Sequence, residues 1–335
     1  MSQHTSVRRA FGRSGKSGEG ASAGARRGGA EILIAASLWG TTGTVRTFAD
    51  GSSAFSIAAI RIIIGGLILL GLAAASRPAA GTSRRGAGLR RLLGDRRNRP
   101  LVAAGAVTIA VYQAAFFVAA GRTGVAVATV VTIGSAPAFT GAIGLVTRRS
   151  VLTGRWALAT AGAVAGCALL VGGGQGSGVE PAGIALALLS GLSYAVYATV
   201  ASALITRGEE DRAVAGALFG TAAVPLVPVL FAEPAGWLAT GQGALIALYL
   251  GVITTGGGYL LFARGLRTTP ATTATTLTLA EPAVAAVLGM VLLDERLGPV
   301  ALGGLALLAA SLVVLVMPVR KRNDGEHIQA GNKLV

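Results

Sequence analysis

The chain has 335 residues, of which 53% are hydrophobic and 13% are charged, and its net charge is +15. Soluble globular proteins carry about 25% charged residues, so this composition excludes an ordinary water-soluble domain and favours a protein embedded in a lipid bilayer. The basic residues form short clusters between long apolar runs, and aromatic residues make up only 5%, which argues against nucleic-acid binding.

The N-terminal residues 1–29 are rich in Ser, Gly and Arg and contain no apolar core. We therefore predict a disordered, basic cytoplasmic tail rather than a cleavable signal peptide. The single cysteine, Cys167, lies inside an apolar run, and the two histidines, His4 and His327, lie in polar terminal segments. The embedded part of the chain thus offers no cysteine pair and no histidine for a metal, and we predict no cofactor.

Ten apolar runs follow, each near the length of about 20 residues that a helix needs to cross the hydrocarbon core. They predict an all-α integral membrane protein with ten transmembrane helices, followed by a cytoplasmic C-terminal tail at 319–335. The runs are Ala30–Thr47, Ala54–Ala75, Leu101–Ala120, Val125–Val146, Trp156–Gly172, Gly183–Ile205, Ala213–Phe231, Ala244–Ala263, Ala271–Leu293 and Val300–Val316.

The distribution of Lys and Arg predicts the orientation of these helices. When the N-terminus is placed in the cytoplasm, nearly all of the 29 basic residues fall on the cytoplasmic side, as the positive-inside rule requires. The exceptions, which lie outside or embedded, are Arg46, Arg61, Arg122 and Arg296. We therefore expect a multi-pass protein of the plasma membrane with both termini in the cytoplasm.

The two halves of the chain resemble each other at a shift of 145 residues. Pro137 then corresponds to Pro282, and Gly144 corresponds to Gly289. Five helices per repeat is an odd number, so the repeats, predicted at 30–173 and 181–318, must enter the membrane from opposite sides. Inverted repeats are typical of secondary transporters that alternate access about a site at the midplane.

Several short motifs carry a resemblance to a known family, and they extend over roughly Ala30 to Pro318. The chain resembles the EamA type of the drug/metabolite transporter superfamily, with two EamA repeats. The motifs are Leu38-Trp39-Gly40, Ala59-Ile60-Arg61, Ser135-Ala136-Pro137, Ala280-Glu281-Pro282 and Leu293-Asp294-Glu295-Arg296-Leu297. The first repeat departs from the family pattern, because Arg148-Arg149-Ser150 stands where an acidic residue is usual.

This resemblance implies a secondary transporter of small metabolites, with export of amino acids or related amphipathic solutes as the first expectation. Efflux of organic cations and a non-transporting membrane sensor remain alternatives. An enzyme is not expected, because no set of nucleophile, base and acid is visible in the sequence. The expected partners are a small-molecule substrate, the lipid bilayer and, as a candidate coupling ion, the proton, while the oligomeric state stays open.

Glu281 is the most informative single residue, because it lies near the middle of the ninth run. A charged carboxylate there costs at least about 2.5 kcal/mol, so it should face the interior, pair with a cation or take up a proton. We interpret it as the site of a substrate amine or a coupling proton; a structural pair with Arg61 or Arg46 is the alternative.

Other embedded residues complete the predicted site. Pro137 and Pro282 interrupt their helices at matching positions of the two halves, which favours a binding site at that depth, although a purely structural kink is the alternative. Arg61 is a candidate for a substrate carboxylate, although snorkelling or structural pairing is also open. The predicted substrate-binding residues are Trp39, Arg61, Tyr112, Gln113, Pro137, Tyr194, Glu281 and Pro282.

Overall fold

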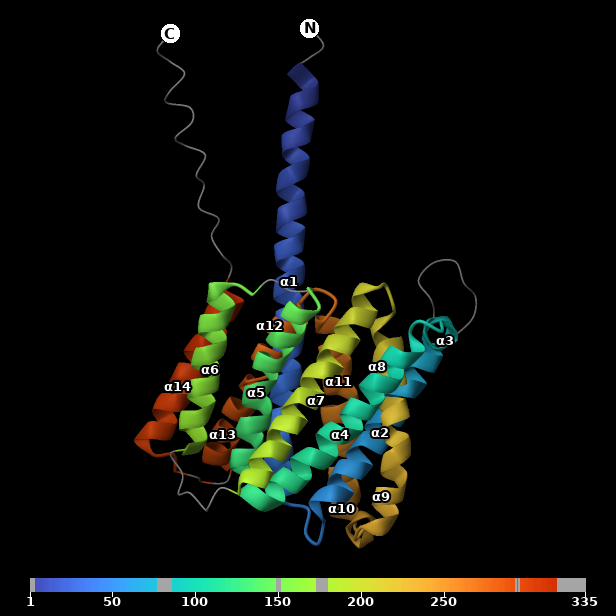
Figure 1. The fold of residues 1–335 in the computed structure, drawn as a ribbon, viewed down its shortest axis with the longest axis vertical. Helices are drawn as coiled ribbons and strands as arrows, with labels where there is room; N and C mark the ends of the chain where they lie inside the picture. The colour runs from blue at the N-terminus through green and yellow to red at the C-terminus, as the bar shows by residue number, and fades with distance from the viewer. Residues whose placement is uncertain are drawn as a thin grey trace.

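The computed structural model describes residues 4–76, 86–148, 152–172, 180–292, 294 and 296–317, so the predicted tail 319–335 lies outside it. Within that part of the chain the regular elements are helices, which stand side by side in one bundle (Figure 1). In order they are α1 (His4–Arg46), α2 (Ala54–Ala75), α3 (Ala87–Gly94), α4 (Arg99–Thr123), α5 (Val125–Val146), α6 (Gly154–Gly172), α7 (Pro181–Thr206), α8 (Asp211–Ala223), η1 (Val224–Leu226), α9 (Val227–Ala232), η2 (Gly236–Ala239), α10 (Gly241–Leu248), η3 (Tyr249–Gly257), α11 (Gly258–Gly265), α12 (Ala271–Leu277), α13 (Ala280–Leu292) and α14 (Pro299–Val316).

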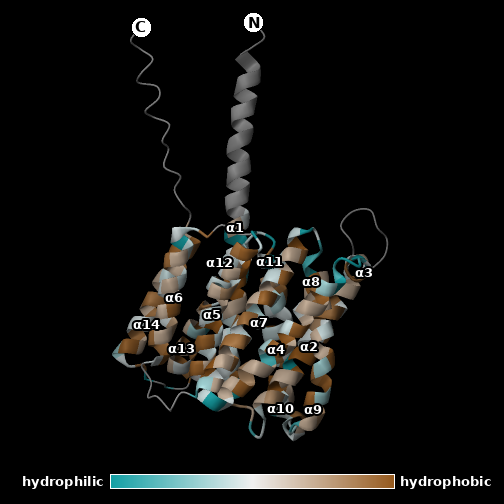
Figure 2. Cartoon of the chain, in the orientation of Figure 1, coloured by the Kyte–Doolittle hydropathy of each residue, from teal (hydrophilic) through white to brown (hydrophobic). Residues whose placement is uncertain are grey.

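Nine helical segments of the described chain are long and apolar enough to cross a membrane. Figure 2 shows hydrophobic residues along the length of the bundle and hydrophilic residues gathered toward its two ends. The nine coincide with the second to tenth predicted runs. The first run lies in α1 and is not among the nine, because Glu31, Arg46 and a stretch of Gly and Thr lower its hydropathy.

The helix α1 is assigned from His4, and the disorder expected at 1–29 stays a prediction. Figure 1 shows this part of α1 projecting from the bundle. No proline interrupts the chain between residues 4 and 46, and Ile32, Ala35 and Ala36 anchor the helix in the core. Extending an anchored helix costs much less than nucleating one, so the helix continues outward past its packed part.

The helix α2 begins where it was predicted because its first turn is capped. The Ser56 backbone N–H donates to the Ser53 hydroxyl at 2.9 Å, and the Ser53 backbone N–H donates to the Ser56 hydroxyl at 3.2 Å. This reciprocal pair satisfies two donors that the start of a helix leaves free. The side chain of Ser56 also accepts a hydrogen bond from the Trp237 indole at 3.0 Å, which joins this turn to the second half of the chain.

The helix packing repeats between the two halves. The helix α1 packs on α11 and α13, and its counterpart α7 packs on α4 and α5, which are the counterparts of α11 and of the α12–α13 segment. The pairs α2–α8, α6–α14 and α5–α12 each join a helix to its own counterpart. Figure 1 shows α1 running away from the end of the bundle at which α14 finishes, which we call the termini end, whereas α7 runs toward that end. The two halves are therefore related as an inverted pair.

Small residues bring α6 and α14 into close contact. A Cβ atom on Gly166 would lie 2.6 Å from the Leu308 backbone nitrogen, and one on Gly304 would clash with the Leu170 backbone. A Cβ atom on Gly162 would lie 2.5 Å from the Ser311 hydroxyl. The Gly162 and Gly166 pair thus serves packing within the chain, as small residues commonly do between membrane helices.

The basic loop after α2 contains an amphipathic helix that the sequence did not predict. In α3, Leu92 is fully buried, whereas Arg90 and Arg91 are exposed. The Arg91 guanidinium forms an ion pair with Glu209 at 3.1 Å, which holds α3 against the loop between α7 and α8.

Two of the long segments are irregular near the middle. The ninth run divides into α12 and α13, and the Glu281 backbone N–H donates to the Thr278 carbonyl at 3.0 Å across the break. The Thr278 carbonyl, expected to be free because Pro282 lacks an N–H, is therefore satisfied. The helix α5, in contrast, continues through Pro137 without a break. The eighth run contains the nine-residue π-helix η3.

Candidate functional site

A cavity of about 560 Å³ lies between the two halves of the bundle, and we call it the central cavity. Its wall is built by α1, α2, α4, α5 and α6 of the first half and by α7, α11, α13 and α14 of the second. Arg46, Val125, Val171 and Gly298 belong to the lining and sit at the ends of their helices away from the termini. The cavity therefore extends toward the end of the bundle opposite the termini.

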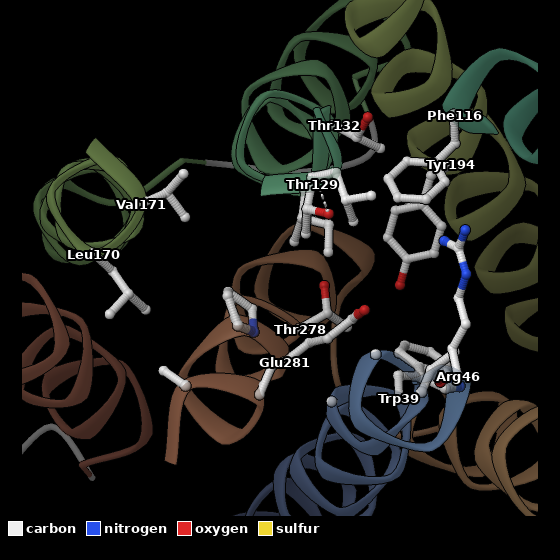
Figure 3. Close-up of a pocket in the computed structure, with 18 of the residues that line it drawn as sticks. Trp39, Arg46, Phe116, Thr129, Thr132, Leu170, Val171, Tyr194, Thr278 and Glu281 are labelled. Carbon is white, nitrogen blue, oxygen red and sulfur yellow. Dashed lines mark hydrogen bonds between the residues drawn. The ribbon is translucent and has the colours of Figure 1, made fainter. Parts of the chain in front are cut away.

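Glu281 reaches the central cavity from the first turn of α13, directly after the break in the ninth run. Figure 3 shows its carboxylate pointing into the space between α1, which carries Trp39 and Arg46, and α5, which carries Thr129 and Thr132. No described cation lies within 4.0 Å of this carboxylate. A half-buried acid without a cationic partner is available to bind a cationic group or a proton.

Arg61 lines the same cavity from α2, and its Nε atom is buried without a hydrogen-bond partner in the described chain. Arg61 and Glu281 form no ion pair with each other within 4.0 Å. The structural pair with Glu281 is therefore not formed among the described residues, and the role of Arg61 stays a prediction. A cation and an anion instead face one cavity with a gap between them.

Aromatic side chains form one wall of the central cavity. The rings of Trp39 and Tyr259 lie 4.7 Å apart, and those of Tyr112 and Tyr194 lie 5.6 Å apart. The Trp39 indole donates to the Thr254 carbonyl at 2.9 Å, which ties α1 to the π-helix η3. The absence of a side chain on Gly258 leaves room for this indole, because a Cβ atom there would lie 2.5 Å from its nitrogen. The π-helix therefore helps to position Trp39.

Unpartnered polar atoms gather at this cavity. Among the described residues, five buried side-chain atoms have no hydrogen-bond partner. Four of them belong to residues that line the central cavity, namely Thr42, Arg61, Gln113 and Tyr194. Leaving such a group without a partner costs about 1 to 3 kcal/mol, so native structures rarely leave one empty. Their concentration here indicates that water or a polar solute occupies the cavity.

Seven of the eight predicted site residues line the central cavity: Trp39, Arg61, Tyr112, Gln113, Tyr194, Glu281 and Pro282. Pro137 does not line it. Their role in substrate binding stays a prediction, although the structure brings these residues together from five helices.

Sequence reasoning missed the arginines at the mouth of the cavity. Arg46 and Arg296 line it together with Arg61, and these three are exceptions to the positive-inside rule. The fourth exception, Arg122, forms an ion pair with Glu180 at 2.8 Å and does not line the cavity. A basic residue on the wrong side of the membrane was therefore the signal that could have identified them.

Comparison with known proteins agrees with this architecture. A model of the EamA-like transporter family matches residues 27–172 and 181–317. The chain is 36% identical over 296 residues to the uncharacterized transporter YwfM of Bacillus subtilis (strain 168), a match that covers 88% of this chain and 95% of that protein. A solved protein crystal structure has a TM-score of 0.70 at 20% identity, covering 86% of this chain and 95% of the other, which supports the fold alone. The family model matches both halves and YwfM spans nearly the whole chain, so the chain belongs to the EamA-like transporter family.

Proposed function

We propose that this protein is a secondary transporter that exports amino acids or closely related amphipathic solutes. The observation that carries the proposal is the gap between Glu281 and Arg61, which face one cavity without pairing. The ammonium and carboxylate of an α-amino acid would bridge a carboxylate and a guanidinium in charge-assisted hydrogen bonds. The aromatic wall formed by Trp39, Tyr112 and Tyr259 would hold the apolar side chain.

The charge of the cavity argues against the export of organic cations. Arg46, Arg61 and Arg296 line it, and Glu281 is the one acidic residue among the described lining residues. The excess of positive charge would repel a solute that carries only a cationic group, and would attract one that carries a carboxylate. A zwitterion with an apolar side chain therefore fits the lining better than a lipophilic cation does.

In this proposal α1 also crosses the membrane and brings the number of transmembrane helices to ten. The protein lies in the plasma membrane with both termini in the cytoplasm. Two observations support this topology. Figure 1 shows the start of α1 and the end of α14 at the same end of the bundle, as an even number of crossings requires. That end also carries the basic helix α3, Arg207 after α7, and Arg264 and Arg267 at the end of α11. The central cavity then extends toward the outside.

Alternating access would explain why Pro137 lies away from the present cavity. The shift of 145 residues pairs Ala136 and Pro137 with Glu281 and Pro282. In an inverted repeat, the conformation that opens to the other side exchanges the roles of the two halves. Ala136 and Pro137 would then line the cavity that opens to the cytoplasm.

Counterflow in proteoliposomes tests the proposed function. The purified protein is reconstituted into vesicles that are loaded with unlabelled α-amino acids, and uptake of labelled L-leucine is followed. We expect leucine to accumulate transiently with the native protein and not with the Arg61→Gln variant. Flux of a lipophilic cation without flux of any amino acid would favour cation efflux. The absence of flux with either class of solute would favour the sensor alternative.

A further inference from the structure

A second cavity lies at the end of the bundle that carries the termini. Its volume is about 600 Å³, and it is lined by the C-terminal halves of α5 and α7 and by residues 266–272 at the start of α12. We call it the threonine cavity, because eight of its lining residues are Thr or Ser. None of them lines the central cavity.

The inverted repeat relates the two cavities. The end of α1, the first half of α5, and α13 contribute to the central cavity. Their counterparts in the other half are the end of α7, the first part of α12, and the second half of α5, and these three segments line the threonine cavity. Each cavity also includes an arginine at the end of the first helix of a repeat, Arg46 in one and Arg207 in the other. The threonine cavity is thus the counterpart of the central cavity at the opposite end.

A thin layer of protein separates the two cavities. Along α7, Tyr194 lines the central cavity and Thr199 lines the threonine cavity, and Tyr197 and Ala198 between them are buried. Along the ninth run, Thr278 lines the central cavity and Thr272 lines the threonine cavity. A separation of five or six residues is about 8 to 9 Å of helix. The threonine cavity therefore ends less than two helical turns from the central cavity.

The chemistry of the threonine cavity suits a carboxylate. Arg207 and Arg267 supply positive charge, and no described lining residue is acidic. The Thr269 side chain is only 6% exposed, and its hydroxyl is the remaining buried polar atom of the described chain without a partner. Arg267 pairs with Asp211 at 3.9 Å, and because the guanidinium is exposed this pair is weak enough for another anion to compete with it. Arginine and hydroxyl groups are common donors to carboxylates.

We propose that the threonine cavity is a second solute site, which binds the carboxylate of the solute on the termini side before the solute enters the central cavity. This inference rests on the proposed function, because the cavity would load a carrier that exports. The site binds through the carboxylate alone, since it offers no acidic group to an ammonium. It therefore differs in specificity from the central cavity, where Glu281 would recognise the ammonium.

Two tryptophans allow the sites to be observed separately. The Trp156 indole donates to the carbonyl of Thr272, a residue of the threonine cavity, at 3.2 Å, whereas Trp39 lines the central cavity. The third tryptophan, Trp237, lines neither cavity and is replaced by Phe in both reporter proteins. A Trp39→Phe protein then reports on the threonine cavity, and a Trp156→Phe protein reports on the central cavity.

Three related probes separate the two kinds of recognition by fluorescence titration. They are L-leucine, isocaproate, which lacks the ammonium, and isopentylamine, which lacks the carboxylate. At Trp156 we expect saturable binding of leucine and isocaproate with similar Kd and none of isopentylamine. At Trp39 we expect leucine to bind roughly tenfold more tightly than isocaproate, because the ammonium would be bound by Glu281. Equal binding of isopentylamine and isocaproate at Trp156, or no saturable response there, overturns the proposal.

Substitutions locate the binding and separate it from transport. The double variant Arg207→Gln/Arg267→Gln should raise the Kd for leucine measured at Trp156 by roughly tenfold. It should leave the Kd for leucine measured at Trp39 unchanged. Arg264→Gln is the matched control, because Arg264 lies at the same end of the bundle but lines neither cavity. If Trp156 responds and no solute is transported, the proposed function fails and the second site stands. If leucine is transported but Trp156 fluorescence does not respond, the second site is excluded and the proposed function stands.

A lipid phosphate is the other anion that could occupy this cavity. The titration is therefore repeated in nanodiscs of neutral lipid and in nanodiscs that contain phosphatidylglycerol. If the site belongs to the solute, the Kd of leucine at Trp156 is the same in both. If phosphatidylglycerol abolishes the leucine response at Trp156 but not at Trp39, the cavity is a lipid site and the proposal is wrong.

Discussion

At the scale of single residues, the distribution of charge in the central cavity carries most of the functional argument. Three arginines and Glu281 line it, and no ion pair within 4.0 Å joins Glu281 to a described arginine. Four residues of the lining also have a buried polar atom without a partner. Buried charges without an ion-pair partner and buried polar atoms without a hydrogen bond destabilise a protein unless a ligand or water binds them. Their gathering in one cavity therefore favours function over packing.

The first prediction concerns the carboxylate of Glu281. We expect Glu281→Gln to abolish leucine accumulation driven by a proton gradient, because the amide can neither bind a proton nor pair with the ammonium. The Kd for leucine should rise roughly tenfold through the loss of one charged hydrogen bond. Uptake into proteoliposomes with and without a pH gradient measures this. Glu180→Gln, at the Arg122 surface pair, is the control and should transport normally. Full gradient-driven accumulation by Glu281→Gln would exclude a coupling role.

The second prediction concerns the guanidinium of Arg61. Arg61→Lys keeps the charge but loses the planar pair of donors that matches a carboxylate, so we expect leucine binding to weaken by about tenfold or more. Arg122→Lys is the matched control, because Arg122 lies outside the cavity in an exposed ion pair. Titration of Trp39 fluorescence with leucine measures both variants. Equal Kd values for the two lysine variants would show that Arg61 does not bind the carboxylate.

At the scale of elements, the site depends on two departures from regular α-helix. The break between α12 and α13 brings Glu281 to the first turn of α13, and the π-helix η3 presents the Thr254 carbonyl to Trp39. π-Helical turns are rare and often mark functional sites. Glycine accommodates the close contacts of η3, since a Cβ atom on Gly258 would lie 2.5 Å from the Trp39 indole nitrogen. The local backbone thus sets the shape of the cavity wall.

A third prediction tests the contact between Trp39 and the π-helix. Gly258→Ala should displace the Trp39 indole and weaken leucine binding several-fold, because the new methyl group would occupy space that the ring nitrogen fills. Gly257→Ala is the matched control, since the nearest atom to a Cβ atom there is 3.6 Å away. Trp39 fluorescence and leucine titration measure both variants. The contact is unimportant if the two variants bind leucine alike.

The sequence predicted the elements whose ends are encoded locally. The bounds of α2 and α5 agree with the predicted runs, because Ser53 caps α2 and Gly124 separates α4 from α5. The π-helix could not be predicted in this way, since it depends on contacts with a distant helix: a Cβ atom on Gly65 of α2 would clash with Thr255.

The candidate site was predictable to a similar extent. The search for polar and helix-breaking residues in apolar runs identified seven of the lining residues. It succeeded because a polar group inside a membrane costs free energy and is usually kept for a function. Periodicity alone could not show that Pro137 lies away from the cavity while its counterpart Pro282 lines it. That difference depends on how the two halves pack in this conformation, in which the central cavity takes in the start of α13 but not the equivalent part of α5.

At the scale of the whole molecule, the proposed alternating access would draw two conformations of the inverted repeat from one set of contacts. The pairs α2–α8, α6–α14 and α5–α12 each join a helix to its counterpart, so these contacts can persist when the two halves exchange roles. The contacts of α1 with α11 and α13 correspond to those of α7 with α4 and α5. In the proposed alternating-access cycle, exchange of these two arrangements would close the central cavity and open the protein at the threonine cavity. The present structure would then be one state of that cycle.

The fourth prediction follows from this exchange and uses the single native cysteine. In a Cys167→Ser background, Ala136→Cys places a thiol at the counterpart of Glu281, where the native side chain is fully buried. We expect this thiol to resist a membrane-impermeant maleimide without solute. Leucine added on the side opposite the termini should drive the transporter toward the inward-open state, so that reagent on the termini side labels it. Ala163→Cys is the control, because Ala163 is equally buried but lines neither cavity, and it should stay protected in every condition. Labelling of Ala136→Cys that ignores leucine, or that occurs from the opposite side, would contradict exchange of the two halves.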